Sequence, residues 1–220
     1  MERVTVMNKV CTDGFCEEIK TILGKRAAGI DMSDKLWEAA VLVPLVRHNG
    51  QTCLLFEVRA ASLSRQPGEV CFPGGKRDET DGGLAMTAVR ETCEELNLPA
   101  TTIRLLGELD YLVTHMGPIV HPFVGVIDDL TQVQPSAEEV QEVFMVPLAY
   151  LLQQVPRTAC MELANKATED FPFELLPQYP KAWNRRRQYD IYFYEYEGHV
   201  IWGITARILH GFLYRLQHEL

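Results

Sequence analysis

The sequence contains no run of eighteen apolar residues, so no segment of it predicts a membrane-spanning helix. It also lacks an excess of basic residues, because 21 Lys and Arg stand against 30 Asp and Glu and give a formal net charge of −9. A chain of this charge has no overall attraction for nucleic acid or for anionic membrane surfaces. We therefore expect no nucleic-acid partner and no membrane. An anionic ligand would need local basic residues or a metal ion to hold it.

Paired cysteine motifs are missing as well. The six cysteines include no C-x-x-C pair and no Cys/His spacing typical of zinc sites, and most lie in apolar stretches. This pattern favours reduced thiols over a disulfide framework. The N-terminal residues do not predict a signal peptide, and His218-Glu219-Leu220 is not a peroxisomal tripeptide. From these absences we expect a cytoplasmic protein.

The composition that remains is that of an ordinary globular chain, with 47% hydrophobic and 23% charged residues in a length of 220. No internal repeat or long Gly/Ser linker divides the chain, so a single domain is the simplest organisation. Patterns typical of strands and of helices are mixed along the chain, and hairpin signals occur among them. This order predicts an α/β fold in which helices cover a mixed, partly antiparallel sheet.

Local patterns predict the individual elements. The Asn49-Gly50 pair between two apolar, β-branched runs predicts a hairpin of strands at 39–46 and 53–58. A long loop follows at 60–75, and the proline-rich segment 156–188 is predicted to be irregular. Further strands are predicted at 103–113, 120–127, 143–146 and 190–196, and helices at 14–29, 84–96, 148–154 and from the candidate cap Thr205 to 220.

The helix predicted at 84–96 has an acidic polar face. At 3.6 residues per turn, Glu94 lies about 60° to one side of Glu91, and Glu95 lies about 40° to the other side. Their carboxylates therefore fall in one arc, where like charges repel and a cation would relieve the repulsion. Oxygen ligands without His or Cys suit Mg²⁺ or Mn²⁺. The far side carries the residues expected to pack on the sheet, namely Ala85, Val89, Cys93 and Leu96.

The same charges have an alternative interpretation as a solvated helix face, with Arg90 and Glu94 as an ordinary i,i+4 ion pair. The loop before the helix favours a functional site over that alternative. Gly74 and Gly75 permit backbone conformations and close approaches that other residues forbid.

These residues resemble the box of the Nudix hydrolases, which has the form Gly, five residues, Glu, seven residues, Arg-Glu-apolar-x-Glu-Glu-x-Gly-apolar. In this sequence the positions are filled in order by Gly75, Asp81, Arg90, Glu91, Glu94, Glu95 and Leu98. Asp81 departs from the usual Glu, eight residues instead of seven separate it from Arg90, and Thr92 takes an apolar place. Asn97 stands where the second Gly is expected, which is a mild change because Asn tolerates the left-handed conformation at a helix C-terminus.

The segment before the box is similar to the signature of the coenzyme A diphosphatase branch of this family, over residues 54–63 and 67–78. That branch also uses Asp and the longer spacing. The likeness covers about residues 36–215, and it implies a Nudix-type α/β/α sandwich. We therefore expect one Nudix domain over 1–220, with its core at about 36–215 and the helix at 14–29 packed on this core.

The resemblance implies metal-dependent cleavage of the diphosphate bond of coenzyme A or acyl-coenzyme A. The products would be 4′-phosphopantetheine, or its acyl form, and adenosine 3′,5′-bisphosphate. Glu91, Glu94 and Glu95 are the expected ligands of Mg²⁺ or Mn²⁺, with Glu94 and Glu95 also counted among the catalytic residues. Arg90 is expected to orient this cluster, since its planar guanidinium can hold two carboxylate oxygens, and the alternative is that it contacts phosphate. The nearest candidates for a general base or a further ligand from outside the box are Glu139 and Glu142, and we assign this role to Glu139.

The small-molecule substrate carries several phosphates, so basic residues near the glycine loop are candidates to bind it. The expected substrate-binding residues are Arg59, Arg65, Gly74, Gly75, Lys76 and Arg77. For each basic residue the alternative is scattered solubilising charge. Alternatives also remain for the function. One is a Nudix hydrolase of ADP-ribose, NADH or another nucleoside diphosphate derivative, and the other is a non-catalytic nucleotide-binding Nudix module. A homodimer is expected by superfamily analogy alone.

Overall fold

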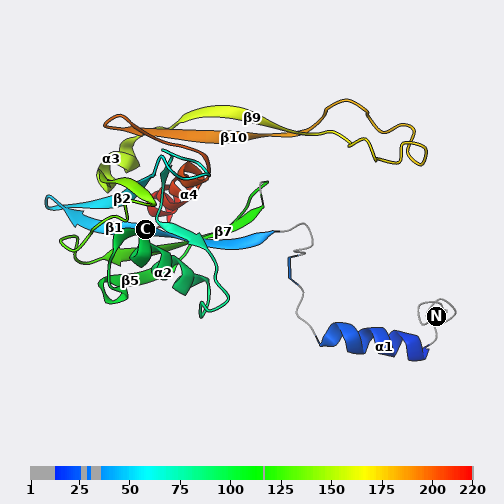
Figure 1. Ribbon diagram of the computed structural model, residues 1–220, viewed down its shortest axis with the longest axis horizontal. Coiled ribbons are helices and arrows are strands. Elements are labelled where there is room, and N and C mark those ends of the chain that lie inside the picture. Colours follow the sequence, from blue (N-terminus) through cyan, green and yellow to red (C-terminus); the bar gives the residue numbers. More distant parts are fainter. Residues whose placement is uncertain (1–12, 26–28, 31–35, 116, 220) are drawn as a thin grey trace. The chain divides into compact units, whose positions relative to one another are not determined.

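The computed structural model describes residues 13–25, 29–30, 36–115 and 117–219 (Figure 1). The chain forms two compact units, Met1–Leu36 and Trp37–Leu220. In the first unit, helix α1 spans Asp13–Gly24, so the helix predicted at 14–29 ends earlier than expected, and residues 26–28 lie outside the described part. The single domain, and the packing of this helix on the core, stay predictions. No helix in the described residues combines the length and the apolar character that crossing a bilayer requires.

The second unit is built on an eight-stranded sheet. Strands β1 (Trp37–His48) and β2 (Gln51–Arg59) form the predicted hairpin, and Asn49 and Gly50 both have positive φ, as an Asn-Gly turn requires. β1 also pairs in parallel with β7 (Pro118–Ile127) over its length. The sheet therefore combines parallel and antiparallel pairs, which confirms the mixed sheet expected from the sequence.

Short strands attach the predicted 60–75 loop to this sheet. β3 (Val70–Cys71) pairs with β2, and β4 (Gly74–Lys76) pairs with β1, so the last part of this loop, which carries the two glycines, is fixed to both strands of the hairpin. The strand β8 lies on the other side of β2 from β1. The bounds of the remaining strands of this sheet are Val70–Cys71 for β3, Gly74–Lys76 for β4, Ile103–Glu108 for β5, Leu112–Val113 for β6 and Val140–Pro147 for β8.

Helices cover both faces of the sheet, with α2 on one side and α4 on the other (Figure 1). Successive side chains of a strand point to opposite faces, so neighbouring residues of β2 enter different clusters. Phe56 packs with Leu209 of α4, whereas Leu55 packs with Leu96 of α2. The α/β/α layering is thus confirmed. The helices of this unit are α2 (Leu84–Leu96), α3 (Leu148–Gln153) and α4 (Gly203–His218), with a 3-10 turn η2 at Ala100–Thr102.

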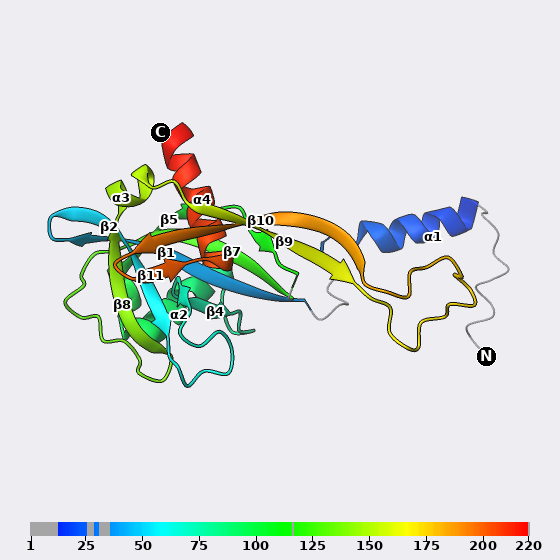
Figure 2. The ribbon, with the colours of Figure 1, turned by 90° about the horizontal axis from the view of Figure 1, so that it is seen from above.

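The prediction of irregular structure at 156–188 is wrong at both ends of that segment. β9 (Arg157–Asn165) and β10 (Asn184–Tyr196) lie side by side in Figures 1 and 2 and form a three-stranded sheet with β11 (His199–Ile201). The prolines do not interrupt these strands, because Pro156 precedes β9 and the others lie between β9 and β10.

Thr205 does not cap the last helix. α4 begins at Gly203, and Trp202 occupies the N-cap position. The Thr205 hydroxyl instead donates a hydrogen bond of 3.1 Å to the carbonyl oxygen of Val70 in β3. The side chain of Thr205 therefore ties the helix to the loop that precedes the acidic helix.

Helix α2 has the predicted bounds, but its buried face is rotated from the expected one. Asn97 adopts the left-handed conformation, with φ 51° and ψ 46°, which confirms the conformation expected of Asn in the place of Gly. Ala85 and Cys93 are only half-buried. The buried residues of α2 are Thr87, Ala88, Val89, Thr92, Glu95 and Leu96. One of the acidic residues therefore belongs to the face that packs on the sheet.

Candidate active site

The two glycines of β4 position the acidic helix against the sheet. The backbone N–H of Gly74 donates a hydrogen bond of 2.8 Å to Oε2 of Glu95. Gly74 has φ 147°, and a Cβ built on it would lie 2.6 Å from the Cα of Val41. A Cβ built on Gly75 would meet the carboxylate of Glu91, with Oε1 at 2.7 Å. Only glycine fits at these two positions without displacing a neighbour. A side chain at position 74 would collide with the backbone of β1, and one at position 75 would collide with the carboxylate of Glu91.

Arg90 lies at the centre of a network of carboxylates. Its Nε and Nη2 donate to the two oxygens of Asp81, at 2.9 and 3.0 Å. Its Nη2 also lies 2.9 Å from Glu91, and its Nη1 lies 3.0 Å from Glu94. The backbone carbonyl of Lys76 accepts a further bond from Arg90. The guanidinium thus links the glycine loop, the turn that carries Asp81 and the acidic face of α2.

Asp81 is the residue of the box that holds Arg90 in place. Besides the two bonds from Arg90, its Oδ2 accepts hydrogen bonds from the backbone N–H of Asp78 and from the Thr87 hydroxyl, at 2.9 and 2.8 Å. These bonds, above all those from Arg90, hold the pKa of Asp81 well below its ordinary value. The side chain is an ionised anchor for Arg90, a role that the sequence pattern did not reveal.

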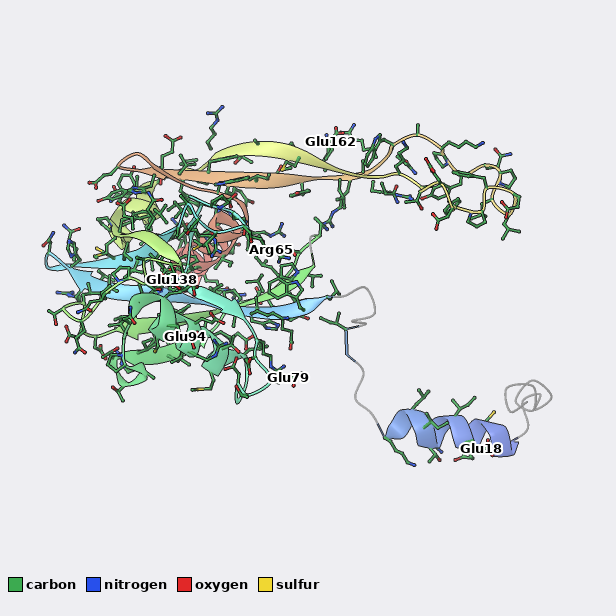
Figure 3. The ribbon with its side chains drawn as sticks, viewed as in Figure 1. Glu18, Arg65, Glu79, Glu94, Glu138 and Glu162 are labelled. Carbon is green, nitrogen blue, oxygen red and sulfur yellow. The ribbon has the colours of Figure 1, made fainter. Side chains whose placement is uncertain are left out.

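The carboxylates of α2 share an arc but differ in depth. The side chain of Glu94 is 58% exposed and that of Glu91 is 16% exposed, whereas Glu95 as a residue is 3% exposed. Figure 3 labels Glu94 on α2. Burial raises the pKa of Glu91 above its ordinary value, with Glu94 and Glu139 adding to the rise and Arg90 opposing it. Burial raises the pKa of Glu95 to about 8, and the charges of Glu91 and Glu139 add to it.

Two acidic residues from outside the box join this cluster. Glu139 directly precedes β8, and its charge raises the pKa of Glu91, Glu95 and Glu57. Glu57 lies in β2, is 1% exposed, and has a pKa raised well above its ordinary range, first by burial and then by Glu95. Glu139 was a candidate from the sequence, but Glu57 was missed. An acidic residue inside the apolar run 53–58 was the signal that could have found it.

The basic residues named from the sequence have different surroundings. Arg77 forms an ion pair of 2.7 Å with Glu38. Arg59 lies beside the buried carboxylates, where its charge lowers the pKa of Glu57 and of Glu95 against the effect of burial.

Arg65 and Lys76 are both exposed, and neither has a carboxylate within ion-pair distance among the described residues. Figure 3 labels Arg65 in the loop between β2 and β3. These two side chains are available to a ligand in solution.

The donor set of this cluster fits a hard divalent cation. All of its donors are carboxylate oxygens, and one of them, Oε1 of Glu57, is buried without a hydrogen-bond partner in the structure. Within the described part of the chain, however, no three or more His, Cys, Asp or Glu side chains lie close enough together to hold a metal ion as they stand. Glu91 and Glu94 are both in contact with Arg90. A cation that bound either carboxylate would therefore share it with the guanidinium.

Comparison with known proteins places this chain in a family. The family model described as "NUDIX domain" matches residues 36–163. The chain is 39% identical over 166 residues to "Peroxisomal coenzyme A diphosphatase NUDT7" of Mus musculus, which covers 76% of this chain and 68% of the mouse protein. It is 36% identical over 174 residues to "Uncharacterized Nudix hydrolase NudL" of Pectobacterium atrosepticum, which covers 79% of each.

Two solved structures match about half of this chain. An Ap4A hydrolase of C. elegans, in a binary complex, has a TM-score of 0.43 at 24% identity, over 50% of this chain and 80% of that chain. A Nudix hydrolase of M. smegmatis, RenU, has a TM-score of 0.43 at 22% identity, over 52% of this chain and 74% of that chain.

Proposed function

We propose that this chain, which belongs to the Nudix family of hydrolases, cleaves the diphosphate bond of coenzyme A or acyl-coenzyme A with Mg²⁺ or Mn²⁺ as its metal ion. The observation that carries the proposal is the hydrogen bond from Gly74 to Glu95. It joins the segment that resembles the coenzyme A signature to the acidic helix of the Nudix box. The 39% identity to a protein named as a coenzyme A diphosphatase supports the same substrate.

In the proposed reaction, water attacks one phosphorus of the diphosphate and the bond from that phosphorus to the bridging oxygen breaks. One product is 4′-phosphopantetheine, or its acyl form, and the other is adenosine 3′,5′-bisphosphate. Glu91, Glu94 and Glu95 are the residues that would hold the metal ion. When bound, the ion would neutralise negative charge on the non-bridging phosphate oxygens and lower the pKa of a water molecule bound to it.

The residues around the metal ligands have separate roles in this proposal. Arg90 orients Glu91 and Glu94 through the ion pairs that it forms with them, and Asp81 fixes Arg90 in turn. Glu139 is exposed next to the cluster, so it can receive the proton that the attacking water loses. The absence of a side chain at Gly75 leaves room for the Glu91 carboxylate, because a Cβ there would lie 2.7 Å from its Oε1.

Coenzyme A carries a 3′-phosphate in addition to its diphosphate, and the net charge of −9 would repel it without local compensation. In this proposal the exposed side chains of Arg65 and Lys76 bind these phosphates. Arg59, at the end of β2, moderates the charge of the buried carboxylates of Glu57 and Glu95. Arg77, which is paired with Glu38, contributes less because that ion pair competes with the ligand.

The test is a hydrolysis screen of the purified chain with Mg²⁺ or Mn²⁺, in which mass spectrometry identifies the products. The substrates are coenzyme A, an acyl-coenzyme A, ADP-ribose and NADH. We expect the highest kcat/KM for one of the two coenzyme A compounds. Much faster cleavage of ADP-ribose or NADH would support the alternative nucleoside-diphosphate function instead. Binding of these compounds without turnover of any of them would support a non-catalytic module.

A cytoplasmic location and a homodimer also belong to the proposal. The mouse relative is named peroxisomal, so the location of the tagged full chain must be imaged in cells. Light scattering after size-exclusion chromatography measures the oligomeric state. A peroxisomal signal would overturn the proposed location, and a monomeric mass would overturn the dimer.

A further inference from the structure

Glu57 is a buried acidic residue that the resemblance to the Nudix box does not explain. It lies in β2, directly opposite Cys71 of β3 and Val143 of β8, so it is enclosed by strands on both sides. Side chains alternate along β2, and Leu55 packs against Leu96 of α2. Glu57 points to the same face of the sheet and therefore toward α2, which carries the acidic residues of the box.

Electrostatic contacts confirm this position. The carboxyl group of Glu57 is within hydrogen-bonding reach of Glu95, and the charges of Glu95 and Glu139 both raise the pKa of Glu57. Glu57 is therefore in contact with the acidic cluster, although its strand precedes the box in the chain.

Among the described residues, the carboxyl group of Glu57 has no cationic partner, and one of its two oxygens has no hydrogen bond. The residue is 1% exposed, and its Oε1 is buried without a hydrogen bond. Among the described residues, no Lys, Arg or His lies within ion-pair distance of it, although the charge of Arg59 acts on it from farther away. A buried carboxyl group is costly to ionise unless a cation or a metal ion lies next to it, and without either it stays protonated.

We propose that Glu57 supplies a carboxylate oxygen to the same divalent cation that the acidic residues of α2 hold. The buried, unpartnered Oε1 is then the oxygen that binds the cation, and β2 contributes a ligand that the box does not contain. This inference rests on the proposed function, since it concerns the metal ion of that site. It extends the function by assigning a ligand that no relative named above specifies.

The experiment measures Mn²⁺ binding to the full chain without substrate, by electron paramagnetic resonance of the free ion. We expect Glu57→Gln to weaken Mn²⁺ binding by at least about tenfold, because even residues that only support metal ligands commonly contribute ~10–100-fold to affinity. Glu57→Asp keeps the charge but shortens the side chain, so we expect a smaller loss.

A second readout separates ligation from a merely structural role. Without metal, Glu57→Gln should raise the melting temperature, because a neutral amide avoids the cost of burying an ionisable carboxyl group beside Glu95. The same variant should gain less thermal stability from added Mn²⁺ than the wild-type chain gains. A residue that only filled space would change neither the metal-free melting temperature in this direction nor the gain from Mn²⁺.

Glu142→Gln is the matched control. Glu142 lies in β8 opposite Val58, so it is close to Glu57 in the sheet but on the other face, with its side chain 50% exposed. We expect Glu142→Gln to bind Mn²⁺ as the wild-type chain does.

Unchanged Mn²⁺ affinity in both Glu57 variants would overturn the inference, and so would an equal loss in Glu142→Gln or a wild-type chain that binds no Mn²⁺. If Glu57→Gln does not fold without metal, the affinity of Glu57→Asp decides the question by the same criterion. Coenzyme A hydrolysis is measured separately. A chain that hydrolyses coenzyme A but binds Mn²⁺ independently of Glu57 contradicts this inference alone. A chain whose Mn²⁺ affinity depends on Glu57 but that leaves coenzyme A intact contradicts the proposed substrate alone.

Discussion

Substituting either glycine of β4 by alanine should be harmful, but in different ways. Gly74→Ala should mainly lower the stability of the fold, whereas Gly75→Ala should mainly lower the catalytic activity. In Gly74→Ala, the new Cβ would meet the carbonyl oxygen of Ala40 and lie 2.6 Å from the Cα of Val41, at φ 147°. Both neighbours belong to the backbone of β1 and cannot move aside. Overpacking typically costs about 1–3 kcal/mol, and a residue forced into such a backbone conformation costs about 1–3 kcal/mol more. Gly74→Ala should therefore lower the free energy of unfolding by roughly 2–6 kcal/mol.

In Gly75→Ala the new methyl group would meet only the carboxyl end of Glu91, with Oε1 at 2.7 Å. This side chain can rotate away, and a displaced rotamer costs only about 0.5–1.5 kcal/mol. The fold should survive, but Glu91 would leave its place beside Arg90. Misplacement of a site group by about 1 Å can cost ~10²-fold in rate, so we expect a loss of that order in turnover of coenzyme A.

Urea unfolding followed by fluorescence measures the first effect, and initial rates with saturating Mg²⁺ measure the second. Gly211→Ala is the control, since a Cβ at this position in α4 meets nothing within 4 Å. It should keep full activity and gain about 0.4–1 kcal/mol of stability. The reasoning is refuted if Gly75→Ala retains wild-type turnover, or if it destabilises the chain as much as Gly74→Ala does.

Other perturbations test the charges of the site. Arg90→Lys loses the planar group that holds both oxygens of Asp81, so turnover should fall by at least about tenfold. An unchanged kcat in steady-state kinetics would contradict the role of Arg90 in orienting the carboxylates. In protein kept metal-free with a chelator, Glu95 has a pKa raised from 4.5 to about 8, so the folded state binds more protons than the unfolded state between these values. The melting temperature should therefore fall as the pH rises from about 5 to about 8, and Glu95→Gln should make this dependence on pH weaker. An equal dependence in both proteins would refute the raised pKa of Glu95. Arg65→Ala should lower kcat/KM for coenzyme A by about tenfold, because charge-assisted hydrogen bonds contribute roughly 1.5–3 kcal/mol. The same substitution should lower kcat/KM for 3′-dephospho-coenzyme A by a smaller factor. Equal losses with the two substrates would show that Arg65 does not bind the 3′-phosphate.

Local sequence was sufficient for the features that depend on near neighbours in the chain. The bounds of α2, the left-handed Asn97 and the Asn49-Gly50 turn followed from helical periodicity and from turn chemistry. The pattern failed at 156–188, where prolines suggested irregular structure. There, pairing between β9 and β10 stabilises strands whose prolines lie outside the paired residues.

The sequence by itself determined that acidic residues share one arc of a helix behind a pair of glycines, because a helix places residues three and four apart on one face whatever surrounds it. Only the tertiary structure decided how deep each carboxylate lies, and therefore that Glu95 is buried while Glu94 is exposed. It alone brought Glu57 of β2 to Glu95 and gave Arg77 the partner Glu38. The reason is that burial and charge contacts between distant segments follow from how strands pair and which face of the sheet a helix covers, and neither is fixed by local spacing.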